Sequence, residues 1–266
     1  MTRYFLIGSC FSTQVGALMQ AAGLEPAVNP FGVLFNPVSI SSAVERMRSG
    51  VPFTAVDVIQ RAPLAEGAVD RREGRDRGYV SFHHHGSFSE PSPEAFLARA
   101  NSSLLDASRL WLESDVVIVT FGTAWVFEYV GAVCPSMRGR VVANCHKHPG
   151  TDFRRRLVCE DEIFSLWDPI LSAVSDKRWI FTISPILHKA DGLEGNRLSK
   201  QTLCRAVARL VEAHPACSRY FHSYEMMTER LTAPRYWSPD GSHPSPEAVE
   251  LIWAEFRGFL HQAPAI

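Results

Sequence analysis

The sequence predicts a three-layer α/β/α sandwich around a mainly parallel sheet. Residues 115–121 and 178–184 are apolar runs rich in β-branched and aromatic side chains, which is typical of strands buried on both faces. Residues 4–7 form a shorter run of the same kind. Segments with helical spacing lie between these runs, and this alternation favours a parallel sheet covered by helices. We expect one domain over residues 1–266, because a chain of this length can form a single full core.

Start signals and periodicity predict the helices in turn. Residues 12–22 carry small and apolar side chains at helical spacing. Asn36-Pro37 joins a capping residue to a proline suited to the first helical position. Ser92-Pro93 predicts another start, with Leu105 on the apolar side of that helix. Further helices are expected at residues 160–174, 198–213 and 246–260.

Two segments lie outside this alternation. Residues 61–78 are charged, contain glycine and lack periodicity, which predicts a long exposed loop. Residues 125–129 and 138–143 have strand-like patterns, so we expect a β-excursion around residues 125–145.

Composition and charge limit the partners. Hydrophobic residues make up 46% of the chain, charged residues 21%, and the formal net charge is -1, so nothing indicates nucleic acid or an anionic membrane as partner. No run approaches the roughly 20 apolar residues that span a bilayer. The six cysteines form no CxxC pair and no secretory leader is evident, so we expect a cytoplasmic protein with reduced thiols.

Small and polar residues follow three of the predicted strands. These are Gly8-Ser9-Cys10, Gly122-Thr123 and Ser184-Pro185. Because ligands bind at the carboxyl ends of strands in parallel sheets, we expect a pocket there.

Cys10 lies between the first strand and the first helix. Backbone N–H groups and the dipole of a helix start lower the pKa of a thiol and favour the nucleophilic thiolate. The alternative is a buried cysteine that acts as a small apolar side chain. Ser9 is a competing nucleophile at the same turn, or a cap for the helix.

Asp240 precedes His243 by three residues in a segment rich in proline and glycine. This spacing lets the carboxylate fold back onto the imidazole, and a nucleophile, a base and an orienting carboxylate are the minimum for covalent acyl transfer. The alternative is a turn aspartate that caps the helix after Pro246, beside an exposed histidine.

Other polar clusters allow different chemistry. Residues 144–148 could supply an amide from Asn144 and cationic groups to an oxyanion or a phosphate, or form a surface loop. A metal hydrolase using residues 83–85 with His146 and His148 is the least favoured alternative, since adjacent side chains on an extended chain point to opposite faces. We therefore expect no metal.

Spaced motifs along nearly the whole chain resemble the GSCFA family of bacterial proteins, which is placed by similarity in the SGNH (GDSL-like) hydrolase superfamily. The motifs are Gly8-Ser-Cys-Phe-Ser12, Asn29-Pro-Phe-Gly-Val-Leu-Phe-Asn-Pro37, His85-Gly-Ser-Phe88, Phe121-Gly-Thr-Ala-Trp125, Asn144-Cys-His-Lys147, Thr182-Ile-Ser-Pro185, Ser199-Lys200, Tyr220-Phe221, Ser223-Tyr-Glu225 and Asp240-Gly-Ser-His-Pro244. The resemblance implies a flavodoxin-like fold of the SGNH type.

The resemblance also implies roles for individual residues. Cys10 stands where the superfamily has its nucleophilic serine, Ser9 stands where an aspartate precedes it, and Asp240 and His243 match the orienter and base. Gly32 corresponds to the glycine whose N–H contributes to the oxyanion hole. The block Gly-x-Asn falls on Gly122-Thr123-Ala124 and lacks its asparagine; Asn144 or Thr123 could replace that donor, with Asn144 favoured. The expected site further includes Gly122, His85, His146 and Lys147.

The implied function is that of an acyl-ester enzyme, an acyltransferase or an esterase, acting on a small-molecule or carbohydrate substrate. A thiolate forms a thioester whose acyl group passes readily to another nucleophile, and a relative in capsule biosynthesis carries a cysteine at the same place. A coenzyme A thioester is a possible donor, with Lys147 and Arg154-Arg155-Arg156 facing its phosphates, and no tightly bound cofactor is expected. The alternative from another class is a catalytically inactive module that binds a carbohydrate or a partner in the same pocket.

Overall fold

The computed structural model describes residues 2–62 and 78–261. The loop predicted at residues 61–78 therefore lies almost entirely outside the described residues. Among the helices of the described part, none is long and apolar enough to cross a membrane.

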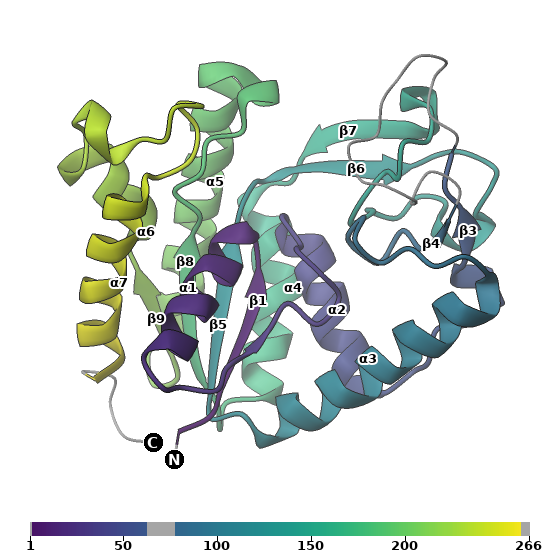
Figure 1. The fold of residues 1–266 in the computed structure, drawn as a ribbon, viewed down its shortest axis with the longest axis horizontal. Coiled ribbons are helices and arrows are strands. Elements are labelled where there is room, and N and C mark those ends of the chain that lie inside the picture. The colour runs from purple at the N-terminus through teal and green to yellow at the C-terminus, as the bar shows by residue number, and fades with distance from the viewer. Residues whose placement is uncertain (1, 63–77, 262–266) are drawn as a thin grey trace.

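A five-stranded sheet forms the centre of the molecule, and all of its strands are parallel (Figure 1). Their order is β2-β1-β5-β8-β9. The bounds are β1 (Tyr4–Gly8), β2 (Ala27–Val28), β5 (Val116–Phe121), β8 (Arg178–Ile183) and β9 (Ser218–Phe221). The predicted buried strands are confirmed, since every residue of β5 is buried.

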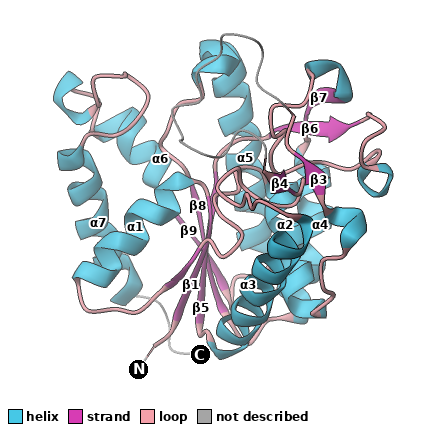
Figure 2. Ribbon diagram, turned by 45° about the vertical axis from the view of Figure 1, so that its right-hand side comes forward, coloured by secondary structure: helices cyan, strands magenta, loops and turns pink. Residues whose placement is uncertain are grey.

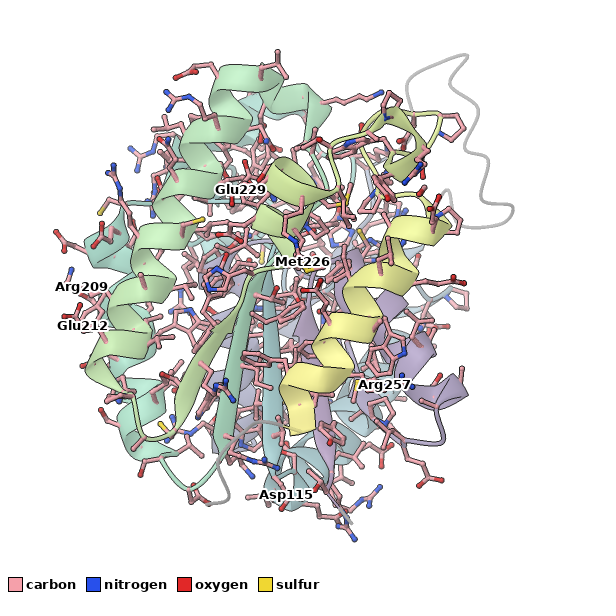
Figure 3. The ribbon with its side chains drawn as sticks, turned by 90° about the vertical axis from the view of Figure 1, so that its left-hand side faces the viewer. Asp115, Arg209, Glu212, Met226, Glu229 and Arg257 are labelled. Atoms are coloured by element: carbon pink, nitrogen blue, oxygen red, sulfur yellow. The ribbon has the colours of Figure 1, made fainter. Side chains whose placement is uncertain are left out.

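Helices cover both faces of this sheet (Figure 2). The longer ones are α1 (Cys10–Ala21), α2 (Pro37–Ser49), α3 (Pro93–Glu113), α4 (Glu160–Ala173), α5 (Gly192–Ala213) and α7 (Pro246–His261), and α6 (Ser223–Glu225) is a single short turn. Figure 3 shows Arg209 and Glu212 on the outer side of α5, and Arg257 on the outer side of α7.

The alternation of side chains along the strands divides the core between the two faces. Phe5 and Ile7 pack with residues of α2, α3, α4 and α5, whereas Leu6 packs with residues of α1 and α7. The three-layer α/β/α prediction is therefore confirmed.

The predicted start signals act as caps in the structure. Asn36 and Ser92 each accept a hydrogen bond from a backbone N–H in the first turn of α2 and α3, with Pro37 and Pro93 at the first helical positions. The placement of Leu105 on the apolar side of α3 was wrong, because 73% of this residue is exposed.

The excursion after β5 differs in part from its prediction. β6 (Trp125–Tyr129) is a strand, but its regular partner is β7 (Phe153–Leu157), in an antiparallel hairpin. Residues 138–143 contribute only an isolated bridge between Glu128 and Val141. A second small sheet joins β3 (Ile59–Gln60) and β4 (Tyr79–Val80). Figure 1 shows both small sheets together beside the upper, carboxyl end of the central sheet.

Glycine is required where β1 turns into α1. Gly8 has a φ of +144°, and a Cβ there would lie 2.2 Å from the carbonyl oxygen of Thr120 on β5. Only glycine permits this approach of two strand ends, which leaves Ser9 and Cys10 directly above the sheet.

Candidate active site

A cavity of about 920 Å³ opens at the carboxyl ends of β5 and β8. Its volume is in the range of small-molecule sites. The lining residues come from seven separate segments: Cys10, Phe35, Asn36, Thr123, Trp125, Phe127, Val142, Ala143, Asn144, Cys145, Arg155, Ile186, Leu187, His188, Lys189, Ala190, Asp191, Asp240, Ser242 and His243. The predicted pocket at the strand ends is present, and it joins Cys10 to Asp240 and His243 from the other end of the chain.

Cys10 is the first residue of α1 and is partly buried. Ser9 before it is 1% exposed, and its Oγ accepts a hydrogen bond from the N–H of Phe11 at 3.3 Å. Ser9 therefore caps α1, and it is Cys10 that lines the cavity.

The expected lowering of the Cys10 pKa is wrong. Burial raises the pKa of this thiol, while the N–H groups of Cys10 and Phe11 and the charge of Lys200 act in the opposite direction. Desolvation of the thiolate outweighs the helix start here, so the resting side chain is a thiol that needs a base.

Asp240 and His243 form a hydrogen-bonded pair on the loop before α7. The Nδ1 of His243 lies 2.5 Å from Oδ2 of Asp240, and Oδ1 accepts backbone N–H groups from Ser242 at 2.8 Å and His243 at 3.0 Å. These three hydrogen bonds lower the pKa of Asp240 to about 2, so the carboxylate is ionised at neutral pH. A hydrogen bond from Nδ1–H leaves Nε2 of His243 as the free basic nitrogen.

Cys10 and His243 line one cavity, but no hydrogen bond joins their side chains among the described residues. Catalytic hydrogen bonds are commonly long before substrate is bound. The geometry therefore brings the predicted nucleophile, base and orienter together at one site without a preformed thiolate–imidazolium pair.

Residues 122–124 make a tightly held turn after β5. The N–H groups of Gly122 and Thr123 both donate to the carbonyl of Phe35, at 2.7 and 3.0 Å. The Oγ of Ser199 on α5 lies 3.1 Å from Oγ1 of Thr123 and accepts the N–H of Ala124 at 2.8 Å. The hydroxyl of Thr123 is thus engaged by α5, although Thr123 lines the cavity.

Lys200 lies beneath this turn and is completely buried. Its Nζ donates to the carbonyls of Gly122 at 2.8 Å and Ser184 at 2.6 Å, which links the carboxyl ends of β5 and β8. Burial lowers the pKa of Lys200 to about 7. The resemblance pointed to the pair Ser199-Lys200, and the structure shows that this pair holds the strand ends.

Asn144 lines the cavity as predicted, and a second asparagine, Asn36, lines it as well. Oδ1 of Asn144 accepts the N–H of His146 at 2.8 Å. Oδ1 of Asn36 accepts the N–H of Ser39 at 2.8 Å, as the cap of α2. Sequence reasoning read Asn36 only as a cap, because capping alone explains an Asn-Pro pair.

His188 and Cys145 are cavity residues that the sequence analysis did not select. Burial lowers the pKa of His188 to about 4, so its imidazole is neutral at pH 7, and burial raises the pKa of the Cys145 thiol to about 11. His188 could have been selected from the sequence because it lies shortly after the predicted strand end Ser184-Pro185.

Six predicted site residues do not line this cavity: Ser9, Gly122, Gly32, His85, His146 and Lys147. Gly32 donates its N–H to the carbonyl of Asn29 at 2.8 Å, which argues against its expected role in an oxyanion hole. His85 hydrogen-bonds Ser87 through Nδ1, and Lys147 is exposed. His146 is 2% exposed and its Nε2–H donates to the carbonyl of Ser81 at 2.7 Å, so it fastens its loop to the β3–β4 region.

The basic triplet of β7 is paired with carboxylates. Arg154 and Arg156 both contact Glu128, and Arg156 also contacts Glu162. Arg155 pairs with Asp191, and its guanidinium lies 3.9 Å from the ring centroid of Trp125, at the cavity wall. These pairings reduce the positive charge that the triplet could offer to phosphates.

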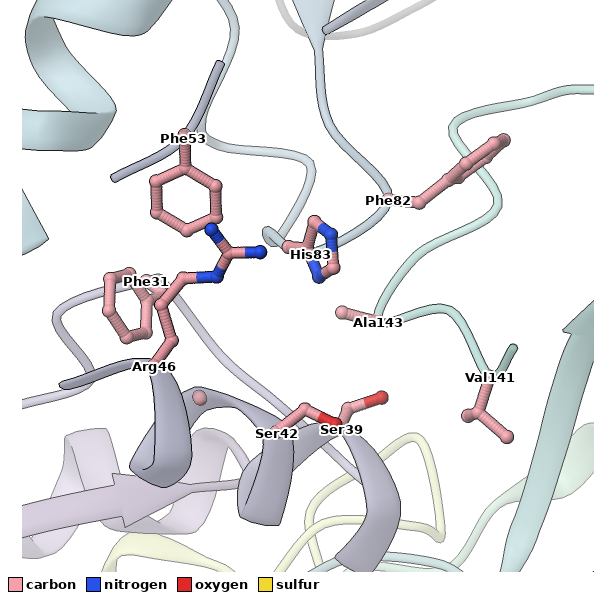
Figure 4. A pocket seen from close by; sticks show the side chains of 10 residues that line it. Phe31, Ser39, Ser42, Arg46, Phe53, Phe82, His83, Val141 and Ala143 are labelled. Atoms are coloured by element: carbon pink, nitrogen blue, oxygen red, sulfur yellow. The ribbon is translucent and has the colours of Figure 1, made fainter. Parts of the chain in front are cut away.

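Residues 83–85 point in different directions. His83 lies 3.4 Å from Asp57, while His84 is enclosed in the core. Figure 4 shows the guanidinium of Arg46 pointing towards His83 and Phe53 in a separate cavity of about 20 Å³. That volume holds about one water molecule and excludes a substrate.

Solved structures with a similar fold include an acetyl xylan esterase from Butyrivibrio proteoclasticus, with 12% identity, a TM-score of 0.45, and coverage of 98% of this chain and 63% of that one. A family 3 carbohydrate esterase from Talaromyces cellulolyticus has 12% identity and a TM-score of 0.37, with coverage of 98% of this chain and 97% of that one. A carbohydrate esterase with divergent catalytic and non-catalytic binding functions has 11% identity and a TM-score of 0.42, with coverage of 99% of this chain and 66% of that one. The chain thus spans about two thirds of the length of two of these proteins.

Similarity at this level says nothing about the reaction of this chain. No curated protein matches the sequence. A model of the GSCFA family matches residues 3–256, which is nearly the whole chain, and the protein therefore belongs to the GSCFA family.

Proposed function

We propose that this protein acts on acyl esters through a covalent thioester on Cys10, with His243 as base and Asp240 as its orienter. The observation that carries the proposal is that one cavity contains the thiol and the imidazole–carboxylate pair. The ionised Asp240 holds the proton of His243 on Nδ1, so the other ring nitrogen, Nε2, is the basic one.

The raised pKa of Cys10 assigns His243 a full role as general base. Nε2 takes the thiol proton as Sγ attacks the carbonyl carbon, and returns it to the oxygen of the leaving alcohol when the C–O bond breaks. Water or a second hydroxyl then attacks the thioester with His243 again as base, so that hydrolysis and acyl transfer differ only in the acceptor.

The walls of the cavity suit a substrate with both apolar and hydroxyl surfaces. Phe35, Trp125 and Phe127 supply aromatic faces, while Asn144 and Asp191 supply polar groups. We propose a carbohydrate or small-molecule ester as substrate. A coenzyme A thioester remains a candidate donor, although the arginines of β7 already have carboxylate partners.

A second candidate is a module that binds such a ligand without turnover. Two observations favour it: the raised pKa of the Cys10 thiol and the absence, among the described residues, of a Cys10–His243 hydrogen bond.

The intact mass of the protein after exposure to 4-nitrophenyl acetate, and separately to acetyl-coenzyme A, tests both candidates. We expect one acetyl adduct on the wild type, none on Cys10→Ala, and an unchanged adduct on Cys145→Ala, the second cavity thiol. The exposed Cys159 provides a control variant, Cys159→Ala, outside the cavity. The donor that gives the adduct separates esterase from transferase. No adduct and no loss of either donor would favour the binding module.

A further inference from the structure

The turn after β5 cannot supply the side-chain amide that an oxyanion hole needs. Ala124 stands where the superfamily pattern has asparagine, and its side chain is completely buried in the core beside β5. The hydroxyl of Thr123 is held by Ser199. The side-chain amides that line the cavity belong to two other segments, at Asn36 and Asn144.

The side-chain amide of Asn36 is held through its oxygen, whereas its nitrogen is available to a ligand. It is 5% exposed, and its Oδ1 is fixed by the N–H of Ser39 at 2.8 Å. Because a backbone N–H can only donate, the oxygen of the amide must face the helix and the nitrogen must face away from it. In the part of the chain that the structure describes, this Nδ2 has no hydrogen-bond partner, and Asn36 borders the cavity.

The segment that carries Asn36 lies against the turn of the nucleophile. The N–H of Leu34 donates to the carbonyl of Gly8 at 2.9 Å, and the carbonyl of Phe35 accepts Gly122 and Thr123. A Cβ at Gly122 would lie 3.0 Å from the Phe35 oxygen and 3.3 Å from the Cβ of Ser9. Residues 34–36 are thus wedged between the ends of β1 and β5, one residue from the start of α2 and next to the turn that presents Cys10.

The start of α2 adds to the effect of the amide. Asn36 caps a helix of 13 residues, and the positive end of its dipole is directed at the same place. Oδ1 of Asn144 is also held, by the N–H of His146 at 2.8 Å, but Asn144 is more exposed than Asn36 and does not stand at the start of a helix. Asn144 therefore has neither the burial nor the helix dipole that Asn36 combines.

We propose that the Nδ2–H of Asn36 donates to the carbonyl oxygen that becomes an oxyanion when Cys10 attacks the ester. This role rests on the proposed function. When the Sγ–C bond forms, the π electrons of the carbonyl move to oxygen, where Asn36 and the N–H of Cys10 hold the negative charge. The electron pair on the oxyanion re-forms the carbonyl as the C–O bond to the leaving alcohol breaks, and His243 protonates that alcohol.

The test compares acylation of Cys10 with its alkylation in the variant Asn36→Ser. Serine caps a helix as well as asparagine does, but its short side chain places no amide in the cavity. We expect the rate of acetyl transfer from 4-nitrophenyl acetate to fall ~10²–10³-fold, as when other oxyanion donors are removed. Alkylation by iodoacetamide passes through no oxyanion, so its rate should stay within about twofold of the wild-type rate.

Matched variants separate chemistry from folding. Ser92→Ala removes the cap of α3, far from the cavity, and should leave acylation unchanged while lowering the melting temperature. Asn36→Asp retains the cap and the shape of the side chain but replaces the donor by an anion, and should be at least as slow as Asn36→Ser. Asn144→Ala removes the other side-chain amide of the cavity wall and should slow acylation less than Asn36→Ser does.

Each other result overturns the role of Asn36. Equal acylation by Asn36→Ser and the wild type, or a parallel fall in acylation and alkylation, excludes donation to an oxyanion. A large loss in Asn144→Ala alone assigns the donor to Asn144. If the wild type itself forms no adduct and consumes no donor, the proposed function fails and this role fails with it, whereas an active wild type with an equally active Asn36→Ser refutes only the inference.

Discussion

At the scale of single residues, the pair Asp240–His243 shows how a short loop can orient a base without burial. The side chains of both residues are nearly half exposed, and the carboxylate is positioned by N–H groups of its own loop. The Asx-type turn that would merely cap a loop also fixes the imidazole. The structural and catalytic interpretations of this motif are therefore compatible.

Replacing His243 by alanine tests the base directly. We expect Cys10 acylation to fall by about 10³-fold or more, because the thiol with its raised pKa then has no partner for its proton. The melting temperature should hardly change, since the imidazole is 44% exposed. Rates of adduct formation by mass spectrometry, with His222→Ala as an exposed control, measure the effect.

Asp240→Asn should also slow acylation, because an asparagine cannot hold the same tautomer of His243. With a pKa of about 2, Asp240 stays ionised from pH 5 to 9 and contributes no inflection to the wild-type profile in that range. Activity retained by His243→Ala would transfer the role of base to His188, the other imidazole in the cavity.

Cys10 also shows why sequence reasoning about a thiol can fail. Its place at a helix start could be read from the sequence, and so could the favourable backbone N–H groups. The depth at which the thiol lies could not be read from the sequence, since it depends on loops far along the chain. Burial decided the direction of the pKa.

At the scale of elements, α5 holds the two central strands together at the floor of the cavity. Lys200 links the carbonyls of Gly122 and Ser184, and Ser199 holds the turn that follows β5. A buried lysine whose pKa is lowered from above 10 to about 7 binds its proton less tightly than in the unfolded chain. Stability contributed by this group therefore increases as the pH rises from 7 to 10.

The variant Lys200→Met should lose that pH dependence. We expect the free energy of unfolding of the wild type to rise relative to that of the variant. The rise should be on the order of 1 kcal/mol per pH unit between pH 7 and 9. Urea titrations at the two pH values measure it. The exposed Lys189 gives a control, Lys189→Met, in which no such change is expected. A constant difference for Lys200→Met would show that Lys200 is not the group responsible.

The hairpin β6–β7 marks the limit of prediction at this scale. Residues 125–129 were predicted as a strand, and residues 138–143 were predicted as the other strand-like segment of the excursion, whereas the regular strand beside β6 is formed by residues 153–157. Local pattern favours neighbours in sequence, and the three arginines of β7 resemble a solvated loop. Their carboxylate partners Glu128, Glu162 and Asp191 come from three other segments, and only Glu162 lies near the arginines in the sequence.

At the scale of the whole molecule, the layers could be predicted because burial on two faces leaves a strong local signal. The strands β5 and β8 are mostly apolar and almost entirely buried, and parallel strands require crossover connections, which are usually helices. The candidate site was partly predictable for the same reason: strand ends converge at one edge. Asn36 and His188 were missed because each lies on a connection whose path only the folded chain determines.

The acid stability of the molecule should depend on His84, which is enclosed in the core without a polar partner. It is 0% exposed among the rings of Phe31, Phe53, Phe88 and Phe96, and in the described part of the chain neither ring nitrogen has a hydrogen-bond partner. Burial lowers the pKa of His84 well below its usual value. The unfolded chain takes up a proton here below about pH 6.5 and the folded chain does not, so stability falls as the pH decreases.

His84→Leu should therefore be more stable than the wild type and less sensitive to acid. At pH 7.5 it removes two unpartnered nitrogens, each of which costs about 1–3 kcal/mol when buried. Between pH 7.5 and 5 its melting temperature should fall less than that of the wild type; a smaller fall remains because burial lowers the pKa of His146 to about 3 and that of His188 to about 4. Thermal unfolding of the wild type, His84→Leu and the exposed control His222→Leu at both pH values measures these differences. An equal fall in wild type and His84→Leu would mean that acid destabilises the fold elsewhere, with the loop fastened by His146 as the first place to look.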